Sequence, residues 1–590
     1  MTERPGPLHV EELAALGDAP IGPCDVLIVG GGPAGLSVAR GLAQAGRRSL
    51  VLESGGLVEQ ESTEALNETL GDADLWTPRQ ALKRQGFHTH LTRLWHHERQ
   101  GFGVRCRALG GSTVAWAGKS AAFSEQDYAA RPWVPGSGWP VTAAELAPYV
   151  DKAAEALNLG LNCYDGRLWT HLRRPPPEPR PDPAVLDSFF WQFARSTLDP
   201  TDVLRAGAEF IQAAPPGCRV LTGATVLEVL CDASGTRACA VLVADATGAR
   251  RTIEAQTIVL AASAIENARL LLNSRSRHPN GLGNDHDLVG RCLLDHPNAR
   301  LASFGPQAIA SMSRLFGFYG LKGHQGVSMY MHGLAPTARV QEEEGLLNCA
   351  AYTTGERAPD DPWSAVRRIV RRQSKDYAAD TCAVLRSPGL MAKGMARLAF
   401  QSKRFPSAWS RFAVQQVLRW RPGLAVEEYL TRGIPHKLVG LSIHALCEQV
   451  PDRDNRITLS QRQDRFGMPL PLARWRIGEL ELRTLTRLGE IVQREFARAG
   501  LPPPVLADWI AERDARGADI IDMGHSAGTT RMAADPARGV VDAHCKVHGV
   551  HGLYIAGASV FPTCGHANPT LMIVAFAYRL ADHLARERRP

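Results

Sequence analysis

A glycine-rich segment near the start of the chain holds the first residues whose types and spacing could do chemistry. The run Gly30-Gly31-Gly32-Pro33-Ala34-Gly35 directly follows the short apolar stretch Asp25–Val29. Gly30 permits a tight turn, Gly32 lets the backbone approach a pyrophosphate, and Gly35 allows a helix to pack closely on a strand. The unpaired N–H groups at the start of that helix would bind phosphate oxygens.

The elements that must position this turn form a complete βαβ unit. Asp25–Val29 has the pattern of a buried parallel strand, apolar residues within Leu36–Ala43 recur at helical spacing, and Gly46 ends the helix. Ser49–Leu52 is a second apolar strand, and it ends at Glu53, which would accept the hydroxyls of an adenosine ribose. Turn glycines alone are weak evidence, but here all these features occur in register. The sequence predicts dinucleotide binding, disfavours a phosphorylated ribose, and leaves FAD and NAD open at this point.

The composition excludes several classes of protein. The chain has 590 residues, 44% of them hydrophobic and 22% charged, which suits a large two-part enzyme or several domains. No apolar run approaches the ~20 residues that span a bilayer, and the start lacks a secretory signal, so we expect a cytoplasmic protein without a transmembrane segment. The net charge of +7 comes without a dense basic block and by itself says little about nucleic acid; no nucleic-acid partner is expected. The 12 cysteines form no CxxC pair, so no zinc site is expected.

Distant segments identify the dinucleotide. Arg105–Gly118 is a loop containing Gly110-Gly111-Ser112, suited to letting backbone lie against a flat ring or a phosphate. The carboxyl end adds His525–Met532, Gly552–Thr563 and His566–Thr570, followed by a closing helix. Together with the βαβ unit, these segments resemble the glucose-methanol-choline (GMC) family of FAD-dependent oxidoreductases. The resemblance is strongest to bacterial members that act on sugars, glycosides or aminoglycoside units.

Three middle segments extend the resemblance over nearly the whole chain. Thr225–Val229, which includes Val226, looks like the family's strand beside the adenine, and Ile258–Leu272 looks like its strand and helix near the cofactor. Cys447–Leu459 looks like a strand pair of its substrate domain. Six matching segments in the family's order predict FAD as the cofactor.

The family architecture implies an α/β fold with two interleaved domains. One is a Rossmann-like FAD-binding domain with a parallel sheet; the other is an α+β substrate domain with a mostly antiparallel sheet and a helical cap. Leu321–Met331 and Leu438–Leu446 are partly alternating apolar segments that suit strands of the second sheet. The expected boundaries are 1–125, 205–300 and 520–590 for the FAD-binding domain, and 126–204 and 301–519 for the substrate domain, with a helical insertion at 362–430.

The resemblance also assigns the chemistry. It makes His525 the general base that takes a hydroxyl proton while hydride leaves the carbinol carbon for flavin N5, and Asn568 a hydrogen-bond donor to the same oxygen. A neutral imidazole suits this task because its ordinary pKa is about 6.5, and a nearby donor stabilises the developing alkoxide. His566 is the rival partner, and with Trp116 and Met523 it is a tentative substrate contact.

The predicted FAD contacts follow from the same segments. Some family members attach FAD covalently through a histidine, and Ala115 stands at that place here, so we expect non-covalent FAD. His544, His548 and His551 have helical spacing, but glycines interrupt the stretch, and no metal site is predicted. The predicted FAD-binding residues are Gly30, Gly32, Pro33, Ala34, Gly35, Glu53, Gly110, Gly111, Ser112, Ala115, Val226, Gly557, Ala558, Asn568, Pro569 and Thr570.

The expected function is oxidation of a CH–OH group of a sugar, glycoside or pseudosugar to a carbonyl. The alternatives are oxidation of a sterol, aliphatic or aryl alcohol, and a non-redox activity like that of hydroxynitrile lyases. The small-molecule alcohol would be the partner, and the electron acceptor, O2 or another compound, stays open together with the oligomeric state.

The insertion at 362–430 has a composition of its own. Apolar residues at three- and four-residue spacing predict amphipathic helices in Trp363–Gln373, Leu390–Ser402 and Trp409–Trp420. A cap over the active site is the favoured interpretation; a membrane or partner surface is the alternative, because basic residues cluster there. These are Arg367, Arg368, Arg371 and Arg372.

Overall fold

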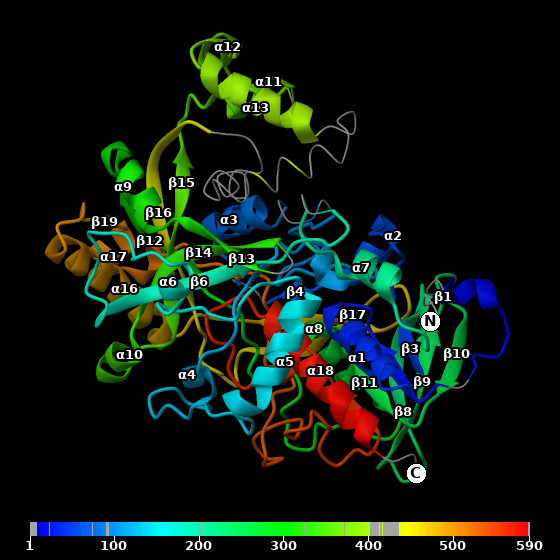
Figure 1. The fold of residues 1–590 in the computed structure, drawn as a ribbon. Coiled ribbons are helices and arrows are strands. Elements are labelled where there is room, and N and C mark those ends of the chain that lie inside the picture. Colours follow the sequence, from blue (N-terminus) through cyan, green and yellow to red (C-terminus); the bar gives the residue numbers. More distant parts are fainter. Residues whose placement is uncertain are drawn as a thin grey trace.

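The computed structural model of the chain describes residues 9–22, 24–72, 75–89, 92, 94–199, 202–323, 326–370, 372–401, 412, 416 and 436–587. Figure 1 shows an antiparallel sheet and its helices on one side of the molecule and a parallel sheet with its covering helices on the other. The predicted α/β class with a parallel and a mostly antiparallel sheet is confirmed.

A six-stranded sheet lies under the predicted dinucleotide turn, and all its pairings are parallel. Its central strands are buried on both faces, which explains why they read as continuous apolar runs. Three helices lie beside it (Figure 1): α1 (Pro33–Gln44), α18 (Thr570–Arg586) and α5 (Ala143–Ala156). Helix α18 contacts both α1 and α5, although it is far from them in the sequence. In sheet order, the strands are β1 (His9–Glu12), β7 (Cys218–Thr222), β3 (Ser49–Leu52), β2 (Val26–Val29), β11 (Ile258–Leu260) and β20 (Leu553–Ile555).

Two small sheets flank this layer. The first is antiparallel and consists of β10 (Arg250–Glu254), β9 (Ala238–Ala244) and β8 (Thr225–Cys231). The second consists of β17 (Arg456–Gln463), β18 (Pro469–Arg474) and β4 (Leu70–Gly71). Helix α8 (Ser263–Asn273) contacts both sheets and so joins them to the parallel layer.

The largest sheet has eight antiparallel strands and forms the second core of the molecule. Helix α16 (Glu479–Arg498) covers it, and buried side chains such as Leu301, Ile443 and Phe496 fill the interface. The path runs β19 (Val505–Leu506), β12 (Asn298–Phe304), β16 (Leu438–Cys447), β15 (Cys349–Arg357), β14 (Gly326–Pro336), β6 (Leu186–Phe193) and β5 (Lys119–Ser120), with β13 (Phe318–Gly323) against β14.

The remaining helices are 3-10 helices and α-helices of up to 14 residues. The 3-10 helices are Leu13–Leu16, Ala65–Asn67, Gly111–Val114, Pro306–Ala308, Ala515–Gly517 and Ala558–Val560. The α-helices are α2 (Glu61–Glu64), α3 (Pro78–His88), α4 (Glu125–Tyr128), α6 (Leu168–His171), α7 (Ala206–Ala213), α9 (Ile309–Leu315), α10 (Ala338–Glu344), α11 (Pro362–Val370), α12 (Tyr377–Leu385), α13 (Pro388–Gln401) and α17 (Asp508–Ala511). None of the described helices is long and apolar enough to cross a membrane.

Two sequence-based predictions of strands were wrong in detail. Leu321–Met331 is not one strand, because β13 ends at Gly323 and β14 begins at Gly326, and the two form an antiparallel hairpin. Cys447–Leu459 contains the end of β16 and the start of β17, but these strands lie in different sheets and do not pair. Apolar alternation marks a strand and carries no information on its partner, so pairing is decided by distant segments.

The insertion is partly described. Helices α11 and α13 overlap the predicted segments Trp363–Gln373 and Leu390–Ser402 but begin one and two residues earlier, whereas α12 was not predicted. The predicted helix at Trp409–Trp420 lies outside the described residues except for positions 412 and 416, and so does Arg371. Figure 1 shows α11, α12 and α13 grouped together beyond the ends of β15 and β16. The role of a cap stays a prediction, as do the domain boundaries.

Candidate active site

A cavity of about 480 Å³ joins the dinucleotide turn to the antiparallel sheet. Its lining includes Gly32 and Glu53 from the βαβ unit, Tyr352 from β15, and both His525 and Asn568 from the carboxyl end. Chain segments more than 500 positions apart in the sequence therefore line one space.

The glycine turn has the geometry that the sequence predicts. Gly30 has a φ of +111°, and a Cβ there would lie 2.5 Å from the carbonyl oxygen of Ala261 on the neighbouring strand. A Cβ at Gly35 would clash with the carbonyl oxygen of Gly30, so only glycine lets α1 lie this close to β2. The turn and the second glycine loop also touch, since the N–H of Gly110 donates to the carbonyl of Gly31 at 2.7 Å.

Glu53 lies at the end of β3, where the ribose acceptor is expected. Its carboxylate accepts the backbone N–H of Gly31 at 2.8 Å and of Gly55 at 2.7 Å. Burial raises the pKa of Glu53, while these two hydrogen bonds and the Arg107 charge oppose that rise. Each carboxylate oxygen retains a free acceptor position, so the group can still accept hydroxyl donors from the cavity that it lines.

An ion-pair cluster closes the cavity beside α8. Glu266 on α8 contacts Arg105, Arg107 at 3.0 Å and Arg269 at 3.4 Å, and Arg269 also reaches Asp464 at 2.8 Å. Burial alone would raise the pKa of Glu266, but Arg107, Arg269 and Arg105 lower it to about 2. The cluster fixes the loop at 105–107 against α8 and the segment before β18.

The structure brings His525 and Asn568 together. Nδ2 of Asn568 lies 3.1 Å from Nε2 of His525, and both side chains line the cavity. Oδ1 of Asn568 is buried and has no hydrogen-bond partner among the described residues. The pair therefore presents an imidazole nitrogen and an amide side by side at the cavity wall.

A second histidine fixes the proton on His525. Nε2 of His296 lies 3.2 Å from the carbonyl oxygen of Cys564, which can only accept, so this nitrogen carries the proton. Burial lowers the pKa of His296 to about 4, so the ring is neutral and its Nδ1 is an acceptor. That Nδ1 lies 2.8 Å from Nδ1 of His525. His525 must therefore donate from Nδ1, which leaves its Nε2 as the basic nitrogen next to Asn568.

Asp295 holds the backbone around the same histidines. Its carboxylate accepts the backbone N–H groups of His296 at 2.7 Å, Met523 at 2.9 Å and His525 at 2.9 Å. Burial lowers the pKa of His525 well below its ordinary value, and repulsion from His296, once that ring is protonated, and from Lys119 lowers it further. The imidazole is thus kept neutral and ready to accept a proton.

Most other predicted site residues line the cavity, including Trp116 and Met523, but three do not. Gly35 and Gly110 lie behind the cavity wall and act through the close approaches described above. His566 packs its ring 4.5 Å from that of Phe189, and both its nitrogens lack hydrogen-bond partners among the described residues. The lining residues of the prediction are Gly30, Gly32, Pro33, Ala34, Glu53, Gly111, Ser112, Ala115, Val226, His525, Gly557, Ala558, Asn568, Pro569 and Thr570.

Sequence reasoning missed several residues of the site, among them Asp295, His296 and Lys119. Asp295 and His296 follow the buried run Cys292–Leu294, and this adjacent polar pair was the only local signal. Lys119 lies one position beyond the predicted glycine loop and lines the cavity.

The histidines considered as a metal cluster have other neighbours. His544 stacks on His583 with 4.4 Å between ring centroids, and Nε2 of His548 lies 3.0 Å from the carbonyl of Ala533. Within the described residues, no group of three or more His, Cys, Asp or Glu side chains is arranged to hold a metal ion.

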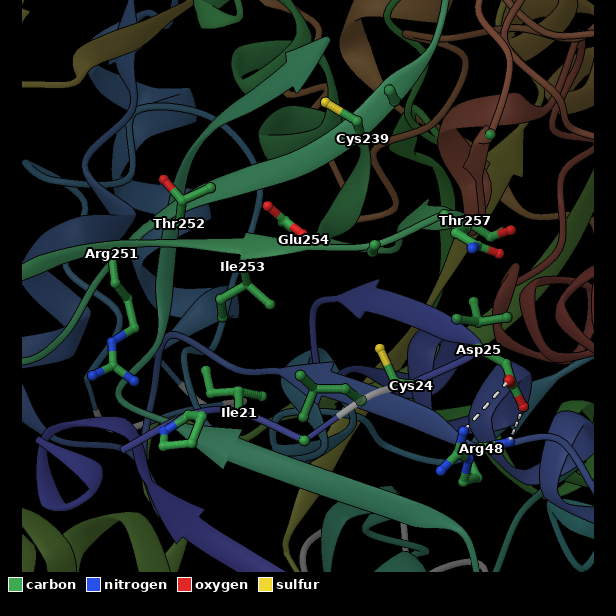
Figure 2. Close-up of a pocket in the computed structure, with 18 of the residues that line it drawn as sticks. Ile21, Cys24, Asp25, Arg48, Cys239, Arg251, Thr252, Ile253, Glu254 and Thr257 are labelled. Carbon is green, nitrogen blue, oxygen red and sulfur yellow. Dashed lines mark hydrogen bonds and ion pairs between the residues drawn. The ribbon is translucent and has the colours of Figure 1, made fainter. Parts of the chain in front are cut away.

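A larger cavity of about 1440 Å³ lies elsewhere and contains none of the predicted site residues. Figure 2 shows that Ile21 and Cys24 face Ile253 of β10 across it, and that Asp25 pairs with Arg48 at its edge. It is therefore separate from the cavity of His525.

The glycine turn, the acidic residue at the end of β3 and the buried amide oxygen of Asn568, which lacks a hydrogen-bond partner among the described residues, fit a flavin dinucleotide. A family model described as FAD binding domain matches residues 23–64, and two models described as GMC oxidoreductase match residues 206–298 and 451–577. The protein is an FAD-dependent alcohol oxidoreductase. More particularly, the chain belongs to the GMC oxidoreductase family.

Similar proteins cover nearly the whole chain. It is 27% identical to 6'''-hydroxyparomomycin C oxidase of Streptomyces lividus, over 99% of this chain and 98% of that protein. It is 26% identical to paromamine 6'-oxidase of Streptomyces fradiae, over 95% and 91% of the two chains. Pyridoxine 4-oxidase from Mesorbium loti shares the fold, with a TM-score of 0.51 and 16% identity over 96% of this chain and 100% of that one.

Proposed function

We propose that the protein oxidises a hydroxyl group of a sugar, glycoside or pseudosugar to a carbonyl, with His525 as the general base. The observation that carries this proposal is the basic Nε2 of His525, which the contact with His296 leaves unprotonated at the cavity wall. Relatives that match 95–99% of the chain and are named as oxidases of paromamine and of hydroxyparomomycin support the substrate class.

The proton follows a short path. A substrate hydroxyl that binds in the cavity beside both side chains would donate to Nε2 of His525 and accept from Nδ2 of Asn568, two atoms that lie 3.1 Å apart. As the hydroxyl loses its proton, Asn568 stabilises the negative charge on the oxygen, and His296 keeps accepting from Nδ1 of His525. The bound FAD supplies the two-electron acceptor for the carbinol hydride.

Residues of the βαβ unit and of the glycine loop would hold the cofactor. The N–H groups at the start of α1 would bind the pyrophosphate beside Gly32, and Glu53 would accept the ribose hydroxyls. Ala115 lines the cavity and offers no atom for a covalent bond, so FAD is held by non-covalent contacts. The proposed FAD-binding domain comprises residues 1–125, 205–300 and 520–590; the substrate domain comprises the rest.

The aromatic side chains of the cavity suit a sugar ring. Trp116, Phe193 and Tyr352 line the same cavity as the catalytic pair, and aromatic faces pack well on the C–H faces of pyranose rings. Of the earlier tentative substrate contacts, Trp116 and Met523 are retained in this proposal. His566 packs against Phe189, so in this proposal it would position aromatic rings behind the cavity lining and would not contact the substrate.

An anaerobic screen tests the function. The holoenzyme is mixed without oxygen with neutral glycosides, aminoglycosides, sterols and simple alcohols, and flavin absorbance is followed. Bleaching by sugar-type compounds supports the proposal, whereas bleaching by a sterol or an aryl alcohol alone contradicts it. Release of cyanide from a cyanohydrin with the flavin still oxidised would indicate a lyase. Peroxide measured with and without a dye identifies the electron acceptor.

A further inference from the structure

Lys119 places an amine in the active-site cavity on a framework of aromatic rings. It lies on β5, whose neighbour across the sheet is Phe193 of β6. Its ammonium nitrogen lies 4.0 Å from the ring centroid of Trp191 and 4.4 Å from that of Tyr352. Both distances allow cation–π attraction, which holds the charge at this point of the wall.

The ammonium group has no carboxylate partner among the described lining residues. The carboxylates there are Glu53, Glu266 and Asp464, and all three are engaged elsewhere. Glu53 accepts two backbone N–H groups, while Glu266 and Asp464 pair with arginines of the cluster beside α8. In the described part of the chain, no hydrogen bond or ion pair to Nζ of Lys119 is formed.

The charged form of Lys119 is destabilised in these surroundings. Burial lowers the pKa of Lys119 to about 7, because the two rings replace only part of its hydration. The charge is also close enough to lower the pKa values of His525 and His566, in each case after the larger effect of burial. A ligand anion beside Lys119 would supply the missing counter-charge.

We propose that Lys119 binds a carboxylate of the substrate, so that the preferred alcohol is an acidic sugar such as a uronic acid or its glycoside. This inference rests on the proposed function, since it concerns the same cavity. The reason is charge: a carboxylate gains a charge-assisted hydrogen bond from Lys119, whereas an amino sugar brings a second cation to a cavity whose described lining residues include no free carboxylate. The specificity of this protein then differs from that named for its paromamine- and hydroxyparomomycin-oxidising relatives.

Binding to the holoenzyme with its flavin already reduced, and kept without oxygen, tests the inference independently of turnover. Isothermal titration calorimetry compares three probes that differ in charge: methyl glucuronide, methyl glucoside and methyl glucosaminide. A hydrogen bond to a charged group contributes about 1.5–3 kcal/mol, so the glucuronide is expected to bind roughly 10- to 150-fold more tightly than the glucoside. The glucosaminide should bind most weakly. Equal affinities, or a preference for the amine, would overturn the inference.

Variants assign the effect to Lys119. Lys119→Gln should remove the preference for the glucuronide and leave affinity for the glucoside within about threefold, and Lys119→Arg should keep part of the preference. Lys546→Gln makes the same change of charge in the separate large cavity and should leave all three affinities unchanged. Bound-flavin absorbance and thermal unfolding verify that each variant is folded. A preference that survives in Lys119→Gln would refute the assignment.

The same probes separate this inference from the proposed function. If the glucuronide binds through Lys119 but no sugar reduces the flavin, the proposed function fails and the carboxylate site stands. If sugars reduce the flavin but all three probes bind equally, the proposed function stands and the inference about Lys119 fails.

Discussion

At the scale of residues, the chemistry of the candidate site depends on which ring nitrogen of His525 carries the proton. Nε2 of His525 can accept a proton only because Nδ1 is committed to His296, whose own proton is committed to the carbonyl of Cys564. A chain of three polar groups thus selects one tautomer of the base. Each link has a consequence that can be measured.

Removal of the base should abolish most of the activity. For His525→Ala we expect anaerobic flavin reduction to slow by about 10²- to 10⁴-fold, because general base catalysis typically contributes that much. FAD should remain bound, since the glycine turn is untouched. His171→Ala, on the exposed face of α6, is the matched control and should reduce its flavin at the normal rate. Normal reduction in the His525 variant would exclude this residue as the base.

The pH dependence should show how far His525 departs from a free imidazole. Burial and neighbouring positive charges lower its pKa, so the neutral, basic form persists below pH 6.5. As pH falls, the rate of flavin reduction should therefore decline only well below pH 6.5, measured by stopped-flow absorbance with saturating substrate. A midpoint of the acidic limb at or above 6.5 would contradict this environment.

His296 is a positioning residue, and its replacement should change the pH profile. His296→Leu removes the acceptor for Nδ1 of His525 and a neighbour that lowers its pKa. Flavin reduction should slow by roughly 10-fold or more, and its acidic limb should move to higher pH. His296→Gln offers an amide oxygen as acceptor and should restore part of the rate. A loss of rate with an unmoved limb would indicate a merely structural role.

At the scale of elements, the contact between α1 and β2 depends on one missing side chain. Gly35 lies in the first turn of α1, where a Cβ would clash with the carbonyl oxygen of Gly30 and lie 3.1 Å from Cγ2 of Ile28. Gly32 lies three residues earlier, and a Cβ there would come no closer than 3.9 Å to its nearest neighbour, the Cα of Gly111. The two glycines thus have separable roles, one in packing and one at the cavity.

Alanine substitutions distinguish these roles. Gly35→Ala should destabilise the protein by about 1–3 kcal/mol even without FAD, because α1 must move away from β2. Gly32→Ala should leave the apoprotein's stability nearly unchanged and weaken FAD binding, since the added methyl group projects where the pyrophosphate is expected. Thermal unfolding and flavin titration of the apoproteins measure both effects. Equal destabilisation by the two variants would contradict this account.

At the scale of the whole molecule, the cluster around Glu266 connects segments that are far apart in the sequence. Glu266 on α8 contacts Arg105 and Arg107, and Arg269 extends the cluster to Asp464 and to the carbonyl oxygens of Met468 and Pro469. The pKa of Glu266 is lowered to about 2 by these arginines, which means that its ionised form stabilises the folded state. That stability is present above the ordinary pKa of about 4.5 and is lost as pH falls towards 2.

Glu266→Gln should therefore lower the stability of the molecule. The shift of the pKa corresponds to about 3 kcal/mol at neutral pH. The loss should shrink as pH falls below about 4, where the wild-type carboxyl is itself losing its charge. The matched control is Glu343→Gln, which breaks an exposed ion pair with Arg339 and should cost at most about 1 kcal/mol. Equal effects of both substitutions on urea unfolding would show that the cluster does not stabilise the fold.

Local sequence predicted much of the dinucleotide-binding half. The βαβ unit around Gly30–Gly35 is specified by contiguous residues, because strand, turn and helix each depend on neighbours within a few positions. The resemblance also selected His525 and Asn568, which are 43 positions apart in the chain and lie 3.1 Å apart in space. The hairpin of β13 and β14 and the separate sheets of β16 and β17 were not predicted, since strand pairing depends on partners elsewhere in the chain.

The sequence by itself thus determined the class of fold, the cofactor and the residue types available for alcohol oxidation. Only the tertiary structure decided which nitrogen of His525 is basic and that Lys119 has no carboxylate partner among the residues that the structure describes. His296 and His525 are 229 positions apart, and the rings around Lys119 come from β6 and β15. Tautomer and charge depend on hydrogen-bond partners, burial and nearby ions, and in a folded chain these come from segments that no local pattern connects.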